Sequence, residues 1–322
     1  MRVPTFENLL QHFRSARGLY LLGAGASAGL APIGHELYRR LALDWWRNGR
    51  GFPPDIGVHI SLVERVIESQ SNCPEEEIIG RSIRPGTPRF PFAEMLQRLP
   101  NGRAQLQAMR ELTEEHYKNR LTDNYRVFRT FYPSVILNYN LDGLASLECG
   151  NWHRVIDIHG TIDPWFGSPG VEKLIAHELD VSFPTDGLIL CEPEGGRELI
   201  LRRRLAAAAS TSPNFVAVIG YSFAKRSGSY DDYVSFEWFA ERFRGFEGYV
   251  YVLDPSPEEL QSAVAGALGS RRVFGVRAWW NVLSHAFCLH LCGRGLGRSI
   301  YATHEMLLSV YGAGCAFSSA PS

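Results

Sequence analysis

The sequence predicts an α/β fold, built on a parallel β-sheet with helical insertions and a helical C-terminal tail. Several short apolar runs each end in a polar or glycine-rich turn, which is typical of buried parallel strands in open α/β sheets. Amphipathic helical patterns lie between these runs. The chain of 322 residues is 45% hydrophobic and 21% charged. That composition is ordinary for a globular protein, and the length allows a substantial buried core.

Five apolar runs are the expected strands of the sheet. They occupy residues 18–22, 134–137, 155–158, 215–219 and 249–253. Each run is short and rich in aliphatic or aromatic side chains. Four of the runs are followed by Gly, Asn or Asp, and the run 155–158 is followed by His159 and Gly160. Because ligands bind beyond the carboxyl ends of strands in such sheets, the turns after these runs are the first places to search for a site.

The expected helices fill the intervals between the strands. Residues 5–17 carry apolar side chains at helical spacing, with Thr5 placed to cap the helix at its start. The apolar positions are Phe6, Leu9, Leu10 and Phe13. Further helices are expected at 101–121, 233–243 and 256–268. The last of these opens with Ser256 and Glu259, the pattern of a capping box.

The spacing of the strands predicts the domain organisation. The interval between the first two strands is far longer than a compact β/α unit needs, so we expect a helical insertion at about 45–130 and a second at about 161–210. The sheet with both insertions forms one Rossmann-like domain over residues 1–269. Residues 270–322 then form a C-terminal helical extension.

Charge and cysteine usage exclude several classes of protein. The net charge of -1 gives no electrostatic reason to expect direct binding of nucleic acid or of an anionic membrane. The run Arg202–Arg204 reads as the solvated face of a helix. Six scattered cysteines form no disulfide framework, and neither a signal peptide nor an apolar stretch of membrane-spanning length occurs. We therefore expect a cytoplasmic protein.

The turn after the first expected strand contains a glycine pattern. Gly23, Gly25 and Ala28 match G-x-G-x-x-G/A, with a strand before and a helical pattern after. Such glycines let the backbone approach a pyrophosphate, and Ser27 adds a hydroxyl donor. The same letters also suit a tightly packed turn without a ligand.

One partner of that glycine pattern is missing at its usual distance. A simple dinucleotide-binding unit places an acidic residue about 20 residues onward, at the end of the next strand. The nearest candidate, Asp44, lies in a segment of helical period. Asp254 ends the apolar run "YVYVLD" and could bind ribose hydroxyls, although it could equally turn the chain at "DPSPEE".

A second group of polar residues follows the next two expected strands. One strand is followed by Asn138, Asn140 and Asp142, whose spacing of two residues would direct their side chains to one side. The other strand is followed by His159. Each has an ordinary alternative role, because strand-end Asn side chains often satisfy local backbone and a lone His is often a core residue. Two such groups at one edge of a sheet point to a common site. Their chemistry suits cleavage of a glycosidic bond, in which carboxylate or carbonyl charge stabilises an oxocarbenium-like state and a His acts as base.

These motifs together resemble the Sir2 (sirtuin) superfamily. "GAGAS" followed by "LAPIG", then "NYNLD", "HGT", "GYS" and "VLD" stand in the order of the GAG-x-S, x-x-N-x-D, HG and G-x-S elements and the late ribose-binding strand end of that family. The resemblance implies a role in binding or cleaving NAD for each matched position. The NAD phosphates would contact Gly23, Ala24, Gly25 and Ser27. Gly220 would also bind NAD, Ser222 would contact phosphate or ribose, and Asp254 would contact the adenosine ribose. Asn140 and Asp142 would lie at the nicotinamide ribose, and His159 would be the catalytic base.

The departures from the family pattern indicate which branch the chain resembles. Only Cys191 lies where sirtuin deacylases carry a four-cysteine zinc ribbon, so no zinc is expected. Ile33, Gly34 and His35 follow Pro32 where deacylases have a "PDFR"-like stretch. The chain is more similar to the Sir2-like proteins of bacterial anti-phage systems. That resemblance implies NAD hydrolysis, gated by oligomerisation or by a partner such as a HerA-type ATPase or an Argonaute-like protein.

Three other functions use the same residues. The chain could be an NAD-dependent protein deacylase, or a sensor that binds NAD or ADP-ribose without turnover. "VAVIGYSFA" also resembles the nucleophile elbow of α/β-hydrolases, with Ser222, Asp254 and His285 in that fold's order. A metal site is a further interpretation of four residues, His285, Cys288, His290 and Cys292. Their spacing fits no common zinc module and instead predicts part of an apolar helix.

Overall fold

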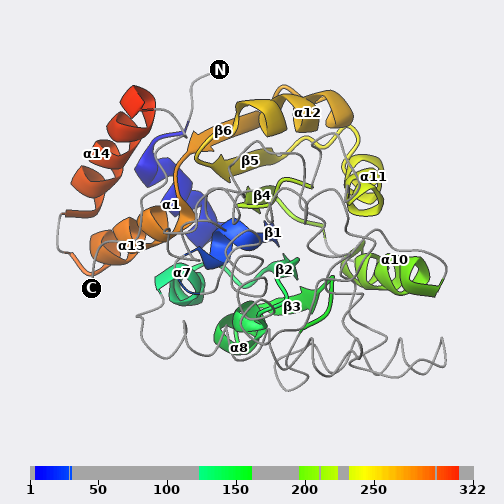
Figure 1. Cartoon of the computed structure of the whole chain (residues 1–322). Coiled ribbons are helices and arrows are strands. Elements are labelled where there is room, and N and C mark those ends of the chain that lie inside the picture. The colour runs from blue at the N-terminus through cyan, green and yellow to red at the C-terminus, as the bar shows by residue number, and fades with distance from the viewer. Residues whose placement is uncertain are drawn as a thin grey trace, which may run out of the picture.

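The computed structural model describes residues 4–28, 30, 123–161, 196–209, 212–223, 232–293 and 296–311. Its centre is a six-stranded sheet in the order β3-β2-β1-β4-β5-β6, with every neighbouring pair parallel (Figure 1). The strands are β1 (Gly18–Leu22), β2 (Val135–Asn138), β3 (Arg154–Asp157), β4 (Phe215–Ile219), β5 (Tyr249–Asp254) and β6 (Val273–Arg277). This is the doubly wound, Rossmann-like α/β arrangement that the sequence predicts.

Helices cover both faces of the sheet (Figure 1). One face carries α1 (Phe6–Ser15), α7 (Asp123–Arg126), the 3₁₀ turn η2 (Val127–Thr130), α8 (Leu144–Cys149) and α13 (Trp280–Leu291), with α14 (Leu296–Tyr311) outside α13. The other face carries α10 (Gly196–Ala209), α11 (Tyr233–Arg242) and α12 (Glu258–Leu268). Strand side chains alternate between the two layers, so each strand contributes to two separate cores.

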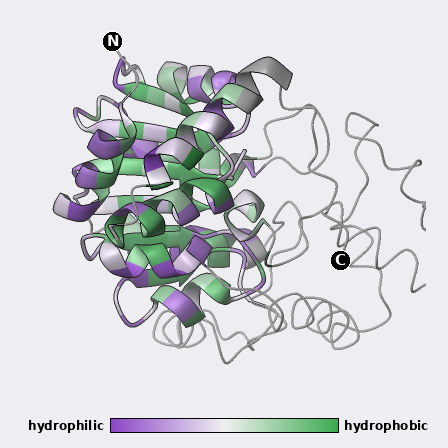
Figure 2. Cartoon of the chain, turned by 90° about the vertical axis from the view of Figure 1, so that its left-hand side faces the viewer, coloured by the Kyte–Doolittle hydropathy of each residue, from purple (hydrophilic) through white to green (hydrophobic). Residues whose placement is uncertain are grey.

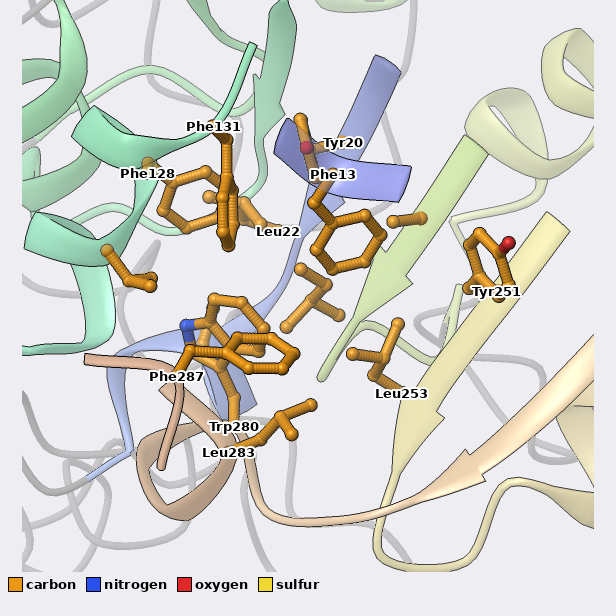
Figure 3. Packing of buried hydrophobic residues seen from close by; sticks show 14 of the residues in the cluster. Phe13, Tyr20, Leu22, Phe128, Phe131, Tyr251, Leu253, Trp280, Leu283 and Phe287 are labelled. Carbon is orange, nitrogen blue, oxygen red and sulfur yellow. The ribbon is translucent and has the colours of Figure 1, made fainter. Parts of the chain in front are cut away.

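The core beneath α1 and α13 is aromatic. Figure 3 shows Phe13, Tyr20, Phe131 and Phe287 gathered between these helices and the sheet. Phe13 is fully buried and stacks on Phe215 with ring centroids 5.2 Å apart. Hydrophobic residues line the strands while hydrophilic ones gather on the outer helices (Figure 2). Burial of this aromatic surface is the main force that fixes α1 and α13 on the sheet.

The five predicted strands are confirmed, with ends that differ by at most one residue from the predicted limits. The predicted first helix is also confirmed, and the side chain of Thr5 accepts a hydrogen bond from the Asn8 amide at 3.3 Å. The capping box at Ser256 is wrong. The Ser256 amide donates to Asp254 Oδ1 at 2.8 Å, and α12 begins after Pro257 without a side-chain cap.

The prediction of a helical extension from residue 270 is wrong at its start. β6 pairs with β5 there, and α13 contributes Trp280, Leu283 and Phe287 to the main core. The predicted limit at residue 269 therefore falls inside the sheet domain. Gly275 lies in the middle of β6, and its apolar run is short, which weakened the sequence signal for a strand.

The second predicted insertion also needs correction. α10 lies within residues 161–210, but it belongs to the sheet domain, because Ile200, Leu201 and Leu205 pack into the second core. Arg202 and Arg203 are exposed as predicted, whereas Arg204 is fully buried. The first predicted insertion, including its helix at 101–121, lies outside the described residues as far as residue 122. Its last part, residues 123–130, belongs to the sheet domain, because Tyr125, Val127 and Phe128 pack into the main core. Of the helices described, none is long and apolar enough to cross a membrane.

Candidate functional site at the carboxyl edge of the sheet

The glycine turn follows β1 as a short 3₁₀ turn, η1 (Ala24–Ser27), and packs against the turn after β4. The Gly23 amide donates to the Ile219 carbonyl, and the Gly25 amide donates to the Gly220 carbonyl, each at 3.0 Å. A Cβ on Gly25 would lie 2.7 Å from the Gly220 Cα. The close approach of two backbones is therefore enough to require glycine at this position.

A hydrogen-bonded group of four side chains lies behind this turn. Asn140 donates from Nδ2 to the Gly23 carbonyl at 2.9 Å and to Ser27 Oγ at 3.1 Å. Ser27 Oγ donates to Asp142 Oδ2 at 2.5 Å and lies 2.6 Å from the Tyr125 hydroxyl. Ser27 is buried, so its hydroxyl supports this group rather than facing solvent.

The acceptors around Asn140 Nδ2 fix the orientation of its side-chain amide. Because Nδ2 faces a carbonyl, the amide oxygen Oδ1 points elsewhere, and it accepts no hydrogen bond from the described part of the chain. Asp142 is fixed at both oxygens, since Oδ1 accepts from the Leu144 amide at 2.9 Å. Burial raises the pKa of Asp142, while the bonds from Ser27 and the Leu144 amide act in the opposite direction.

Asn138 takes the ordinary role that the sequence left open. Its Nδ2 donates to the Asn140 carbonyl at 3.1 Å and to Asp157 Oδ1 at 2.8 Å, and the side chain is fully buried. Ser146 donates to the other oxygen of Asp157 at 2.6 Å. The strand ends at Asn138, and Asp142 lies in a turn, so strand alternation does not place the three side chains together. Asn140 and Asp142 nevertheless meet at Ser27, whereas Asn138 bonds to Asp157.

His159 follows β3 and forms a second polar group with Tyr221, which follows β4, and with Asp232, which caps α11. Its Nε2 lies 2.9 Å from Asp232 Oδ2, and the Tyr221 hydroxyl donates to the same oxygen. The ring of Tyr139 lies edge-on to His159 and stacks on Tyr221 with centroids 3.9 Å apart. The His159 side chain is 23% exposed, and its Nδ1 has no hydrogen-bond partner among the described residues.

The charge state of Asp232 follows from its contacts. Burial raises the pKa of this carboxyl, but the hydrogen bonds from His159, Tyr221 and Ser235 and the nearby imidazole outweigh burial and hold the pKa below its usual value. Burial and the Asp232 charge both raise the pKa of Tyr221. The phenol therefore keeps its proton and donates a hydrogen bond to an ionised carboxylate.

Arg204 lies beneath the His159 turn. It is fully buried on α10 and donates from a guanidinium nitrogen to the Ile158 carbonyl at 2.9 Å. That carbonyl belongs to the peptide directly before His159. A buried guanidinium thus holds the backbone from which the histidine projects, which is a structural role that the sequence prediction of a solvated face missed.

The remaining predicted residues lie in the turn after β4 and at the last position of β5. Gly220 has a φ of +56°, and a Cβ there would lie 2.4 Å from the Gly25 Cα. Ser222 is exposed. Asp254 turns the chain through its bond from the Ser256 amide, which is one of the two roles the sequence allowed.

Several residues of these two polar groups were not identified from the sequence. They are Tyr125, Tyr139, Tyr221, Asp232 and, below them, Arg204. Asp232 had one local signal, its place before a helical pattern, and it does cap α11 by accepting from the Ser235 amide at 3.2 Å. Its partnership with His159 depends on the fold and has no local signature.

The hydrogen bonds given above for the two polar groups include no cysteine or histidine of α13. His285 Nδ1 lies 2.7 Å from Asp123 Oδ2 in an exposed pair. Cys288 is half-buried, and burial raises the pKa of its thiol to about 12. Within the described ranges, no three His, Cys, Asp or Glu side chains gather closely enough to hold a metal ion.

The fold and the site together define a Rossmann-like α/β protein with its polar groups at the topological switch point. That point lies between β1 and β4, where the strand order reverses and where such sheets bind ligands. No protein-family model matches the chain, and no curated protein matches its sequence. Function must therefore be argued from the residues of the site.

Proposed function

We propose that this chain is a Sir2-like NAD⁺ hydrolase that cleaves the nicotinamide–ribose bond to give nicotinamide and ADP-ribose. The observation that carries the proposal is a pair of fixed side chains at the ends of neighbouring strands. Asn140 and His159 are each held at one nitrogen, and Asn140 Oδ1 and His159 Nδ1 remain for a substrate. The resemblance of the glycine turn and the "NYNLD" and "HGT" segments to sirtuins supports NAD as that substrate.

The proposed reaction uses water as the nucleophile. The bond between ribose C1′ and nicotinamide breaks, and its electron pair goes to the nicotinamide ring nitrogen. The oxygen of water forms the new bond to C1′, and His159 Nδ1 takes the proton that this water loses. Asn140 Oδ1 accepts a hydrogen bond from the water or from a ribose hydroxyl, which sets the geometry of attack.

Asp142 supports this arrangement indirectly. Its two oxygens are engaged by Ser27 and by the Leu144 amide, so its contact with the reacting atoms runs through Ser27 and Asn140. A carboxylate in this place adds negative potential behind a ribose that develops positive charge. Of the predicted phosphate contacts, Ala24 and Ser222 are exposed, whereas Gly23 is buried and Ser27 is both buried and engaged.

The biological setting of the proposal rests on the family resemblance alone. An unrestrained NAD hydrolase would deplete its own cell, so we propose a gated, cytoplasmic effector of anti-phage defence. Gating by a homo-oligomer or by a HerA-type or Argonaute-like partner follows from the same resemblance. Neither zinc nor any other metal has a role in the proposed reaction.

The direct test is to incubate purified protein with NAD, alone and with candidate partners, and to measure nicotinamide. Asn140→Ala and His159→Ala should each abolish release while the far-UV circular dichroism spectrum stays unchanged. His285→Ala is the matched control, because this histidine is exposed and paired with Asp123 outside the site. Full activity in both site variants would refute the mechanism.

The same assay separates the alternatives. Release that depends strictly on an acyl-lysine peptide would favour the deacylase, and tight NAD binding without turnover would favour the sensor. Ester hydrolysis lost in Ser222→Ala and His285→Ala would favour the α/β-hydrolase. The geometry supports that last alternative less well, because His285 is paired with Asp123 and the residues with positive φ in the β4 turn are Gly220 and Phe223 rather than Ser222.

A further inference from the structure

The contact between His159 and Asp232 joins two segments that are distant in the sequence. Nε2 of the imidazole lies 2.9 Å from Asp232 Oδ2, within the range of a charge-assisted hydrogen bond. Asp232 is held at both oxygens, since Oδ1 accepts from the Ser235 amide and Oδ2 accepts from Tyr221. The carboxylate therefore has a fixed position toward which the imidazole is oriented.

The direction of this hydrogen bond determines the tautomer of His159. An ionised carboxylate has no proton to donate, so it can only accept from Nε2. Nε2 must therefore carry a hydrogen, and in the neutral imidazole Nδ1 is then the unprotonated nitrogen. Nδ1 is also the nitrogen that has no partner within the described residues.

The aromatic rings beside the imidazole restrict its rotation. Tyr139 lies edge-on to His159 with ring centroids 5.3 Å apart, and it is itself stacked on Tyr221. Tyr221 reaches the same Asp232 oxygen as His159. Ring packing and hydrogen bonding thus favour one orientation of the imidazole.

We propose that Asp232 is a positioning residue for the proposed NAD hydrolysis, which holds His159 by Nε2–H and presents Nδ1 as the atom that accepts the proton from water. The inference rests on the proposed function and assigns a residue that the family motifs do not contain. After proton transfer, the positive charge on the imidazole faces the Asp232 carboxylate. That carboxylate then stabilises the protonated ring without taking the proton itself.

The test uses Asp232→Asn. Asn is as good an N-cap as Asp, so α11 keeps its start, while the side-chain amide can turn an N–H toward His159 Nε2. In protein labelled with ¹⁵N-histidine, two-bond ¹H–¹⁵N correlation spectra distinguish the two tautomers, and His159→Gln assigns the signal. We expect the Nε2–H form in the wild type and a shift toward the Nδ1–H form in Asp232→Asn. Nicotinamide release should fall by about 10²–10⁴-fold in kcat, the range for loss of a general base, with little change in KM.

A second Asp–His pair supplies the control. Asp123→Asn removes the carboxylate that faces His285 on the surface, so it should change the His285 signals and leave both the His159 tautomer and nicotinamide release as in the wild type. An Nδ1–H tautomer in the wild type, or an unchanged tautomer in Asp232→Asn, would overturn the inference. Because the spectra are recorded without NAD, they decide the role of Asp232 even if nicotinamide release fails and the proposed function with it.

Discussion

The contact between the β1 and β4 turns makes a quantitative prediction at Gly220. This residue has a φ of +56°, and an added Cβ would lie 2.4 Å from the Gly25 Cα. Gly269, after α12, has a similar φ of +62°, but a Cβ there would meet nothing within 4 Å. Gly220→Ala and Gly269→Ala therefore share the cost of a positive φ and differ in the steric contact.

The two costs can be separated. An alanine in the left-handed region costs about 1–2 kcal/mol, and overpacking a tight site costs a further ~1–3 kcal/mol. We expect Gly269→Ala to lower the free energy of unfolding only by the backbone cost, and Gly220→Ala to lower it by about 1–3 kcal/mol more because of the steric contact. Urea denaturation followed by circular dichroism measures both values, provided that the slopes with urea agree. A difference below about 0.5 kcal/mol, the usual size of a surface effect, would show that the two turns separate easily and would refute the argument from close packing.

Two further predictions concern the buried Arg204 and three histidines whose pKa is lowered by burial. Arg204→Met should lower the free energy of unfolding by about 1–3 kcal/mol, because the buried Ile158 carbonyl loses its donor. Arg203→Met, at an exposed position, should change that free energy by no more than about 0.5 kcal/mol. Equal losses for the two variants in urea denaturation would contradict the structural role of Arg204. Burial lowers the pKa of His12, His153 and His304 below the usual 6.5, so the unfolded chain binds more protons than the folded chain in that range. The free energy of unfolding should therefore have its full value above pH 6.5 and decrease as the pH is lowered below it. The decrease should be smaller in His304→Gln than in the wild type, and identical profiles of unfolding free energy against pH for the two proteins would rule out the contribution of His304.

The strands were predictable because each central strand is buried on both faces. The sequence of such a strand is a continuous apolar run, as in β1 and β4, and it can be recognised without knowing which strand it pairs with. β6 lies at the edge of the sheet and carries Gly275, where a Cβ would meet the Gln261 side chain at 2.5 Å. That glycine allows α12 to pack closely but removes a strand-forming side chain from an already short run.

Arg204 had a signal in the sequence that the triple arginine concealed. Positions 200, 204 and 208 are four residues apart, so Arg204 shares a helix face with the buried residues Ile200 and Ala208. Helical spacing therefore indicated a buried position for Arg204, and the prediction of a solvated face for the whole arginine run was wrong at this residue. Its hydrogen-bond acceptor, the Ile158 carbonyl, could not be predicted, because the pairing of α10 with the end of β3 exists only in the folded sheet.

The polar groups of the site show the same division. Asn140 and His159 were found because polar residues directly after apolar runs lie at a predictable edge of the sheet. Tyr125 and Asp232 come from helices whose positions depend on the whole fold, and each reads locally as an ordinary helix residue or cap. Sequence thus indicates which strand ends carry chemistry, while the orienting partners require the three-dimensional arrangement.

The glycine turn illustrates why one motif admits two explanations. Gly23 and Gly25 satisfy a phosphate-binding fingerprint, yet their amides donate to the β4 turn, and the space for a Cβ at Gly25 is filled by Gly220. The same absence of side chains that lets a backbone approach a phosphate lets it approach another backbone. If NAD binds at this turn, the packing of the two turns sets the shape of the surface that the phosphates meet, and the chemistry then depends on Asn140 and His159, whose open atoms lie at the same edge of the sheet.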